Sequence, residues 1–305
     1  MASRQENCLA ASCAANNPHP LLQHNKEPET GEGFMNDIPY LLRGVTPVTT
    51  DSSVLLSSSK YLNHPRMRDW ISTITLKRNG TDRPAQAEMY EIVGILDEIQ
   101  DMDYIEELFH KERQTNPELD AWFSEGFQST YGADDFKDYA EGTLGHVFYQ
   151  DVIAKNFDLV IYEQPQPKTQ YDYFRFRNGQ THDLEHIMTG GDFNYMGELV
   201  PAWARITTHF KHFGAELAGE ISVLSMFVNL RYTVRTMLHY PHVWPVCQNA
   251  VERGMRVGRE SGPFFMARYE DAFALPLEEA RAKLGFVGAE YVDTTGPSLS
   301  WAERS

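Results

Sequence analysis

Apolar residues recur at helical spacing along most of the chain, and this periodicity limits the fold more than any other feature of the sequence. Beyond Pro84, intervals of three and four residues separate Met89, Ile92, Val93, Leu96 and Ile99, which places them on one face of a helix. Alternation with a period of two is scarce, and the best strand candidate, 171–176, is short. We therefore predict an all-α fold, with a single helical domain from about residue 80 to about 290 and no internal repeats.

Helix-start and helix-stop residues divide this domain into segments. One helix is predicted to begin at Asn116-Pro117, where a capping residue precedes a first-turn proline. Further helices are predicted over 104–109, 142–153, 193–218, 219–239, 241–260 and 276–284. Residues 291–305 are predicted to form a C-terminal tail.

The first 60 residues differ in composition from the rest of the chain. They are rich in Ser, Asn, Thr and Pro and have few regularly spaced apolar residues, so we predict a disordered N-terminal extension over 1–60. A mitochondrial presequence is the alternative, but Arg4 is the only Lys or Arg among the first 25 residues and Glu6 lies beside it. Met35 is an alternative start, because a more apolar run follows it.

The chain is strongly acidic, with 27 Lys and Arg against 43 Asp and Glu and a formal net charge of −16. Such a chain repels a phosphate backbone, which argues against nucleic acid as a partner. The three cysteines cannot form a disulfide framework and match no zinc-ligand spacing, so a reducing compartment is expected.

The longest apolar stretch, Ile221–Leu238, contains Asn229, Arg231 and Arg235. Charged side chains are costly inside a bilayer. The stretch is therefore predicted to be a buried helix of a soluble domain rather than a membrane span.

A candidate metal site begins with His182 and His186, which are four residues apart, so on a helix their rings project from one face. With 11 His in the chain, about 0.4 pairs at this interval are expected by chance, and about 0.03 with Asp directly after the first His. Asp183 occupies that position and is predicted to be either a ligand or a partner that orients a ring. The pairs His209/His212 and His239/His242, three apart, are interpreted as hydrogen-bonded or solvent-facing histidines.

The next segment offers a further donor. Gly190-Gly191 is expected to end the helix, and Asp192 is predicted to cap the next one. This reversal would bring Glu198 back toward the histidine pair. Two neutral imidazoles and two carboxylates would balance a dication, although a metal-dependent phosphohydrolase site is an alternative interpretation of the His-Asp pair.

The spacing of these residues resembles the Coq-four family of coenzyme Q (ubiquinone) biosynthesis proteins, which is marked by H-D-x-x-H, eleven residues, then E. His182, Asp183, His186 and Glu198 match that motif in register. Segments 141–146, 258–260, 268–270 and 275–279 also resemble the family's flanking signatures, so the resemblance covers about 85–288 in the right order.

The chain departs from the family pattern at the edges of this motif. Arg177–Thr181 stands where the family has an Arg-Tyr-Arg-Glu-type run, and Gly191-Asp192-Phe193 where a proline usually follows. The extension before residue 80 has no family counterpart. These departures fall at the rim of the site, where they bear on the substrate more than on the metal.

The resemblance implies an all-helical fold, often dimeric, with a hydrophobic tunnel for a polyprenyl tail. The aromatic and Met residues that could line it are Phe193, Tyr195, Met196, Trp203, Met226, Phe227 and Tyr232; ordinary core packing is the alternative for each. Arg253, Arg256 and Arg259 form a basic edge that could meet a lipid headgroup or a phosphate, and Arg259 is our candidate for substrate binding. A solvated helix face is the alternative.

The resemblance also implies an activity: the oxidative decarboxylation of a polyprenylated hydroxybenzoate, in which the ring carboxylate at C1 is replaced by hydroxyl with O₂ as co-substrate. Zinc is the expected metal, with iron, manganese or cobalt as alternatives. His182, Asp183, His186 and Glu198 are the candidate ligands, and Asp183 or Glu198 could serve as general base.

A non-catalytic function is the alternative hypothesis, in which the protein is a metal-containing lipid-binding scaffold that organises other ubiquinone-biosynthesis enzymes. In either case the resemblance implies a peripheral protein. It would lie on the cytoplasmic face of a bacterial inner membrane, or on the matrix side of the mitochondrial inner membrane in a eukaryote.

Overall fold

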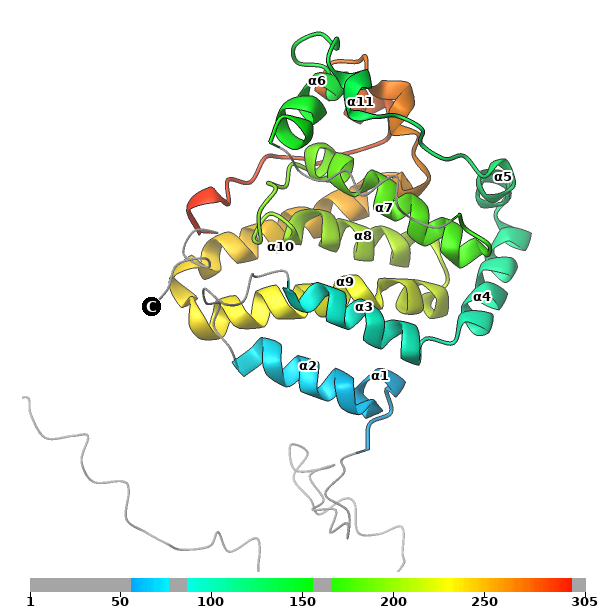
Figure 1. Ribbon diagram of the computed structural model, residues 1–305, viewed down its shortest axis with the longest axis vertical. Helices are drawn as coiled ribbons and strands as arrows, with labels where there is room; N and C mark the ends of the chain where they lie inside the picture. The colour runs from blue at the N-terminus through cyan, green and yellow to red at the C-terminus, as the bar shows by residue number, and fades with distance from the viewer. Residues whose placement is uncertain (1–55, 77–86, 156–165, 298–305) are drawn as a thin grey trace, which may run out of the picture. The chain divides into compact units, whose positions relative to one another are not determined.

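The computed structural model describes residues 56–76, 87–155 and 166–297 (Figure 1). These residues form helices and no strand, apart from two isolated β-bridges, so the all-α prediction is confirmed. The α-helices are α1 (Lys60–Asn63), α2 (Pro65–Leu76), α3 (Ala87–Ile99), α4 (Met102–Thr115), α5 (Pro117–Glu125), α6 (Leu144–Phe148), α7 (Gln170–Thr189), α8 (Leu199–His212), α9 (Ala215–His239), α10 (Trp244–Glu260) and α11 (Leu277–Lys283).

Three long helices form the centre of the described fold. α8 packs along both α9 and α10 (Figure 1). Gly254 and Gly258 of α10 permit the close approach, because a Cβ at either position would collide with the α8 backbone at Val200 or Ala204. The close packing of α8 on α10 therefore depends on two glycines one helical turn apart.

α2 and α3 cover the face of α9 that points away from α10, and their contact residues are buried. Met67, Trp70 and Ile74 of α2 are at most 1% exposed, and the ring of Trp70 meets Phe227 of α9 edge-on at 6.0 Å. Within the described part of the chain, the first helix begins at Lys60, before the predicted boundary near residue 80. The predicted extension over 1–60 lies almost entirely outside the described residues.

α7 is the helix that carries the histidine pair, and it includes 171–176, the segment with the clearest alternation. The aromatic residues of this segment are buried around several sides of the helix, which imitates a period of two. The helix begins with a capping box, in which the Thr169 and Asp172 side chains each bond the other's backbone N–H. It ends at Gly190, whose φ of 82° is left-handed.

Most predicted helix boundaries lie close to the observed ones. Asn116 caps α5 by accepting from Leu119 N at 3.1 Å, with Pro117 in the first turn as predicted. The predicted helix 193–218 is wrong at both ends, since α8 spans Leu199–His212. Asp192 does not cap α8; its carboxylate accepts hydrogen bonds from Thr294 instead.

The polar residues of the apolar stretch lie inside the fold. Asn229, Arg231 and Arg235 of α9 are at most 1% exposed, and Arg235 Nε donates to Ile74 O at 3.0 Å. Across the described ranges, no helix is both long enough and apolar enough to cross a bilayer.

Candidate metal centre

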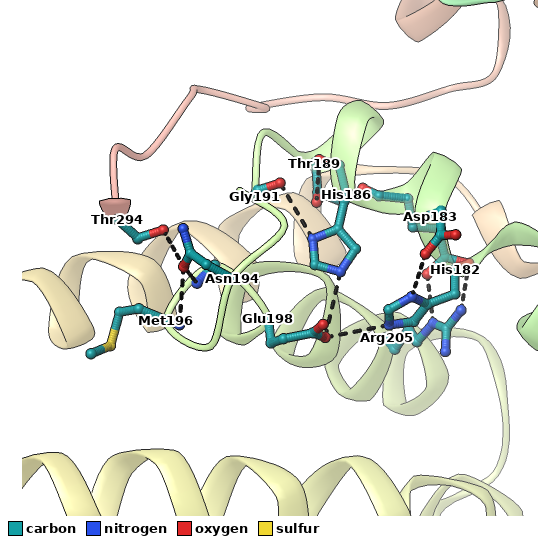
Figure 2. Close-up of polar contacts among 12 residues, drawn as sticks. His182, Asp183, His186, Thr189, Gly191, Asn194, Met196, Glu198, Arg205 and Thr294 are labelled. Atoms are coloured by element: carbon teal, nitrogen blue, oxygen red, sulfur yellow. Dashed lines mark hydrogen bonds and ion pairs between the residues drawn. The ribbon is translucent and has the colours of Figure 1, made fainter. Parts of the chain in front are cut away.

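Three donor atoms from α7 and from the residue just before α8 converge (Figure 2). The four-residue interval directs the rings of His182 and His186 to one side of α7, with centroids 4.9 Å apart. Glu198 Oε2 lies 3.4 Å from Nε2 of each ring. One ligand atom from each residue lies within 4.8 Å of the other two, which is the arrangement that a single cation requires.

His186 has a ring nitrogen that the fold leaves available. Its side chain is 1% exposed. Its Nδ1 lies 3.3 Å from the carbonyl oxygen of Gly191, to which it can donate, whereas the buried Nε2 makes no hydrogen bond. A proton on Nδ1 leaves the lone pair on Nε2, facing Glu198. The donor set and this orphaned nitrogen fit a divalent metal held by His182, His186 and Glu198.

Asp183 lies beside the three converging donors rather than among them. Its Oδ1 is 3.2 Å from His182 Nδ1, on the opposite side of that ring from Glu198. Of the two predicted roles, this geometry favours the one that orients a ring. The structure therefore brings together three of the four predicted ligands.

The Glu198 carboxylate favours a positive charge on the His182 ring. Burial by itself lowers the pKa of His182, but the Glu198 carboxylate and the hydrogen bond to Asp183 outweigh burial and raise that pKa to about 10. Burial raises the pKa of Glu198, yet the charges of His186 and His182 outweigh it, and the pKa falls well below its usual range. A metal ion held between Glu198 and the two Nε2 atoms would be stabilised by the same carboxylate.

An ion pair between Arg205 and Glu185 near the site was not predicted from the sequence. The carboxylate of Glu185 is fully buried, and it accepts from Arg205 Nε at 2.5 Å and Nη2 at 3.0 Å. The charges of Glu185 and Glu198 both raise the pKa of Arg205, against the effect of burial. The sequence did indicate that Arg205 lies near the site. Arg205 follows Glu198 by seven residues, or two helical turns, which places the two side chains on the same side of α8.

A cavity of about 490 Å³ adjoins His186. Phe193 lines it and stacks on the His186 ring at 4.8 Å, with 25° between the planes. The other lining residues include Val147, Asp151, Lys155, Ile187, Asp192, Asn194, Leu277, Arg281, Tyr291 and Thr295. This volume is within the usual range of small-molecule pockets.

The remaining predicted substrate residues do not line this cavity. Tyr195, Met196, Trp203 and Tyr232 belong to a core cluster between α8, α9 and α10. Phe227 packs against the cluster under α2 and α3, while Met226 is 44% exposed. Arg259 is also exposed. The alternative of ordinary core packing therefore describes most of the predicted tunnel residues.

The basic edge and the other histidine pairs have local partners. Arg253 and Arg256 of α10 form ion pairs with Glu290 at 2.5 and 3.2 Å. His209 Nδ1 lies 3.0 Å from Ser222 Oγ, and His239 Nε2 lies 2.9 Å from Thr75 O.

No protein-family model matches the chain, and no curated protein matches it. The chain is similar in structure to a protein of Nostoc punctiforme that is described as having a proposed role in ubiquinone biosynthesis. The TM-score is 0.55 and the sequence identity 22%, over 74% of this chain and 98% of that one. At this identity the similarity shows a shared fold.

Proposed function

We propose that this protein is a metal-dependent enzyme of ubiquinone biosynthesis that oxidatively decarboxylates a polyprenylated hydroxybenzoate. The observation that carries the proposal is the convergence of His182, His186 and Glu198 beside a cavity of about 490 Å³. The resemblance of the motif to the Coq-four family and the fold shared with the Nostoc punctiforme protein support the same pathway.

The number of donors favours an enzyme over a scaffold. Structural zinc sites use four protein ligands, whereas catalytic sites use three and keep a position for water or substrate. Three donors converge among the described residues. The Asp183 carboxylate instead lies beside Nδ1 of His182, the ring nitrogen that faces away from Glu198. Zinc is the proposed metal, with iron, manganese or cobalt as alternatives.

The proposed reaction balances without an external reductant. The ring loses its carboxylate as CO₂, and the electron pair left on the ring passes to O₂. Water supplies the new hydroxyl, so that ArCO₂H + H₂O + O₂ gives ArOH + CO₂ + H₂O₂. A metal bound at the site would supply a Lewis acid for the substrate carboxylate and for charge developing on the ring.

The chain's own residues would position the ring and its charges. Asp183 fixes the orientation of His182, and the Gly191 carbonyl fixes that of His186. Arg205, held by its ion pair with Glu185, lies within electrostatic reach of Glu198. Phe193 and the apolar residues Val147, Ile187 and Leu277 of the cavity wall would exclude water from one face of the ring.

The direct test is product analysis with a prenylated 4-hydroxybenzoate-type acid. The metal-replete protein should release CO₂ and form the ring-hydroxylated product in air, and neither under nitrogen. Glu198→Ala should lower turnover by at least about 100-fold, whereas Glu252→Ala, at an exposed position of α10, should not. A prenyl-free acid should react poorly because the tail helps to hold the ring.

One outcome would favour the non-catalytic scaffold over the enzyme. If the metal-replete protein binds the prenylated acid tightly in air but leaves its carboxylate intact, the site organises a lipid without transforming it. We further propose a homodimer that associates peripherally with the membrane bearing the other quinone-pathway enzymes. Sedimentation of the purified protein, alone and with vesicles, tests both points.

A further inference from the structure

A segment of the predicted C-terminal tail lies directly on the loop that joins the metal donors. We call Glu290–Thr295 the C-terminal strap and Gly191–Gly197 the donor loop, because the donor loop connects His186 to Glu198. The two segments are about 100 residues apart in sequence, yet Val292 N donates to Gly190 O at 3.1 Å, and Val292 bridges to Gly191.

Thr294 is the central contact of the C-terminal strap (Figure 2). It is fully buried, and its N–H donates to Asp192 Oδ2 at 2.9 Å. Its hydroxyl lies 2.9 Å from the same Asp192 oxygen and 2.8 Å from Asn194 Oδ1. One buried hydroxyl thus lies within hydrogen-bond distance of two side chains of the donor loop, and its single proton can be donated to either of them.

Asp192 and Asn194 each act on the backbone next to a candidate metal ligand. Asp192 directly follows Gly191, whose carbonyl lies 3.3 Å from His186 Nδ1. Asn194 Oδ1 accepts a hydrogen bond at 2.9 Å from the backbone N–H of Gly197, which directly precedes Glu198. The strap therefore lies behind both the buried histidine and the carboxylate.

Contacts with α10 and with the end of α7 hold the strap in place. A positioning role requires this. Glu290 forms ion pairs with Arg253 and Arg256 of α10. Gly190 lets the strap lie close, because a Cβ there would be 2.6 Å from Glu290 O. The strap residues Tyr291 and Thr295 also line the cavity beside His186.

We propose that the C-terminal strap is part of the metal centre, with Thr294 as a positioning residue that acts through Asp192 and Asn194 on His186 and Glu198. This inference rests on the proposed metal site. Partners behind metal ligands typically contribute 10- to 100-fold to metal affinity, and Thr294 would contribute on that scale without approaching the metal.

The test uses Co²⁺ as a probe of the full-length protein, because its visible d–d spectrum reports ligand geometry. Thr294→Val keeps the shape of the side chain and removes the hydroxyl. We expect Co²⁺ affinity, measured against a competing chelator, to fall by at least about 10-fold, together with a changed spectrum. Thr294→Ser, which keeps the hydroxyl, should restore both.

A second pair of variants controls for charge and for folding. Asp192→Asn should weaken Co²⁺ binding in the same direction as Thr294→Val. Asp293→Asn makes the same change at an exposed strap residue whose carboxylate accepts a hydrogen bond from Thr295 N, and it should leave the affinity and the spectrum as in the wild type. The melting temperature of each metal-free variant separates loss of the site from loss of the fold.

The outcomes distinguish this inference from the proposed function. If the wild-type protein binds no Co²⁺, the metal site itself is wrong. If the wild type binds Co²⁺ and Thr294→Val binds it equally well with the same spectrum, the strap is structural only and the inference is overturned. If Thr294→Val melts as the wild type does but binds Co²⁺ weakly, the positioning role stands.

Discussion

His186 Nε2 is the atom on which the candidate site depends most, because it is buried without a hydrogen bond. We predict that His186→Ala abolishes stoichiometric metal and that His182→Ala does so too, whereas His242→Ala, at an exposed position, does not. Elemental analysis of protein purified without added metal is the measurement. A full metal equivalent in both ligand variants would remove the metal site from consideration.

At the scale of single residues, the sequence predicted donors better than it predicted their surroundings. The four-residue interval between His182 and His186 follows from helical geometry alone, so these residues could be selected without a structure. The choice between ligand and orienting partner for Asp183 depends on which side of a ring it faces. That is a property of tertiary structure, as is the pairing of Glu185 with Arg205.

At the scale of elements, α2 is the helix that the sequence analysis omitted, although it contributes to the core. Trp70 is 1% exposed and packs on Phe227, so we predict that Trp70→Ala lowers the free energy of unfolding by about 3–5 kcal/mol. Leu76→Ala in the same helix removes a side chain that is 76% exposed, and it should change stability by less than about 0.5 kcal/mol. Urea denaturation compares the two variants. Equal effects would mean that α2 does not pack on α9.

The two departures at this scale have different physical causes. The period of apolar residues identifies a helix when one face is buried, as for 89–99. It fails over the first turns of α7, which is buried on several sides. The period is present in α2, where the buried residues Met67, Trp70 and Ile74 lie three and four residues apart, so this helix could have been predicted from the sequence. Thr169 and Asp172 provided the capping signal for the start of α7.

At the scale of the whole molecule, a buried histidine should make stability depend on pH. Burial, assisted by the charge of Arg205, lowers the pKa of His209 from 6.5 to about 3. Between these values the unfolded chain binds a proton that the folded chain does not, so stability falls as the pH falls. We predict a loss of about 2 kcal/mol between pH 7 and pH 5 from this residue.

The matched variants are His209→Gln, which removes the titrating group from the core, and His242→Gln, which removes an exposed histidine. Urea denaturation at both pH values should show a smaller pH dependence for His209→Gln alone. A pH dependence in His209→Gln equal to that of the wild type would show that this histidine does not couple folding to protons.

The separation in sequence between Thr294 and its partners has a consequence for how the molecule is made. Thr294 is 102 residues beyond Asp192, and translation proceeds at about 5–20 residues per second. All three candidate donors are therefore synthesised roughly 5–20 s before the residue that holds their connecting loop. On the ribosome, the set of donors exists for seconds before the strap that fixes its geometry has been translated.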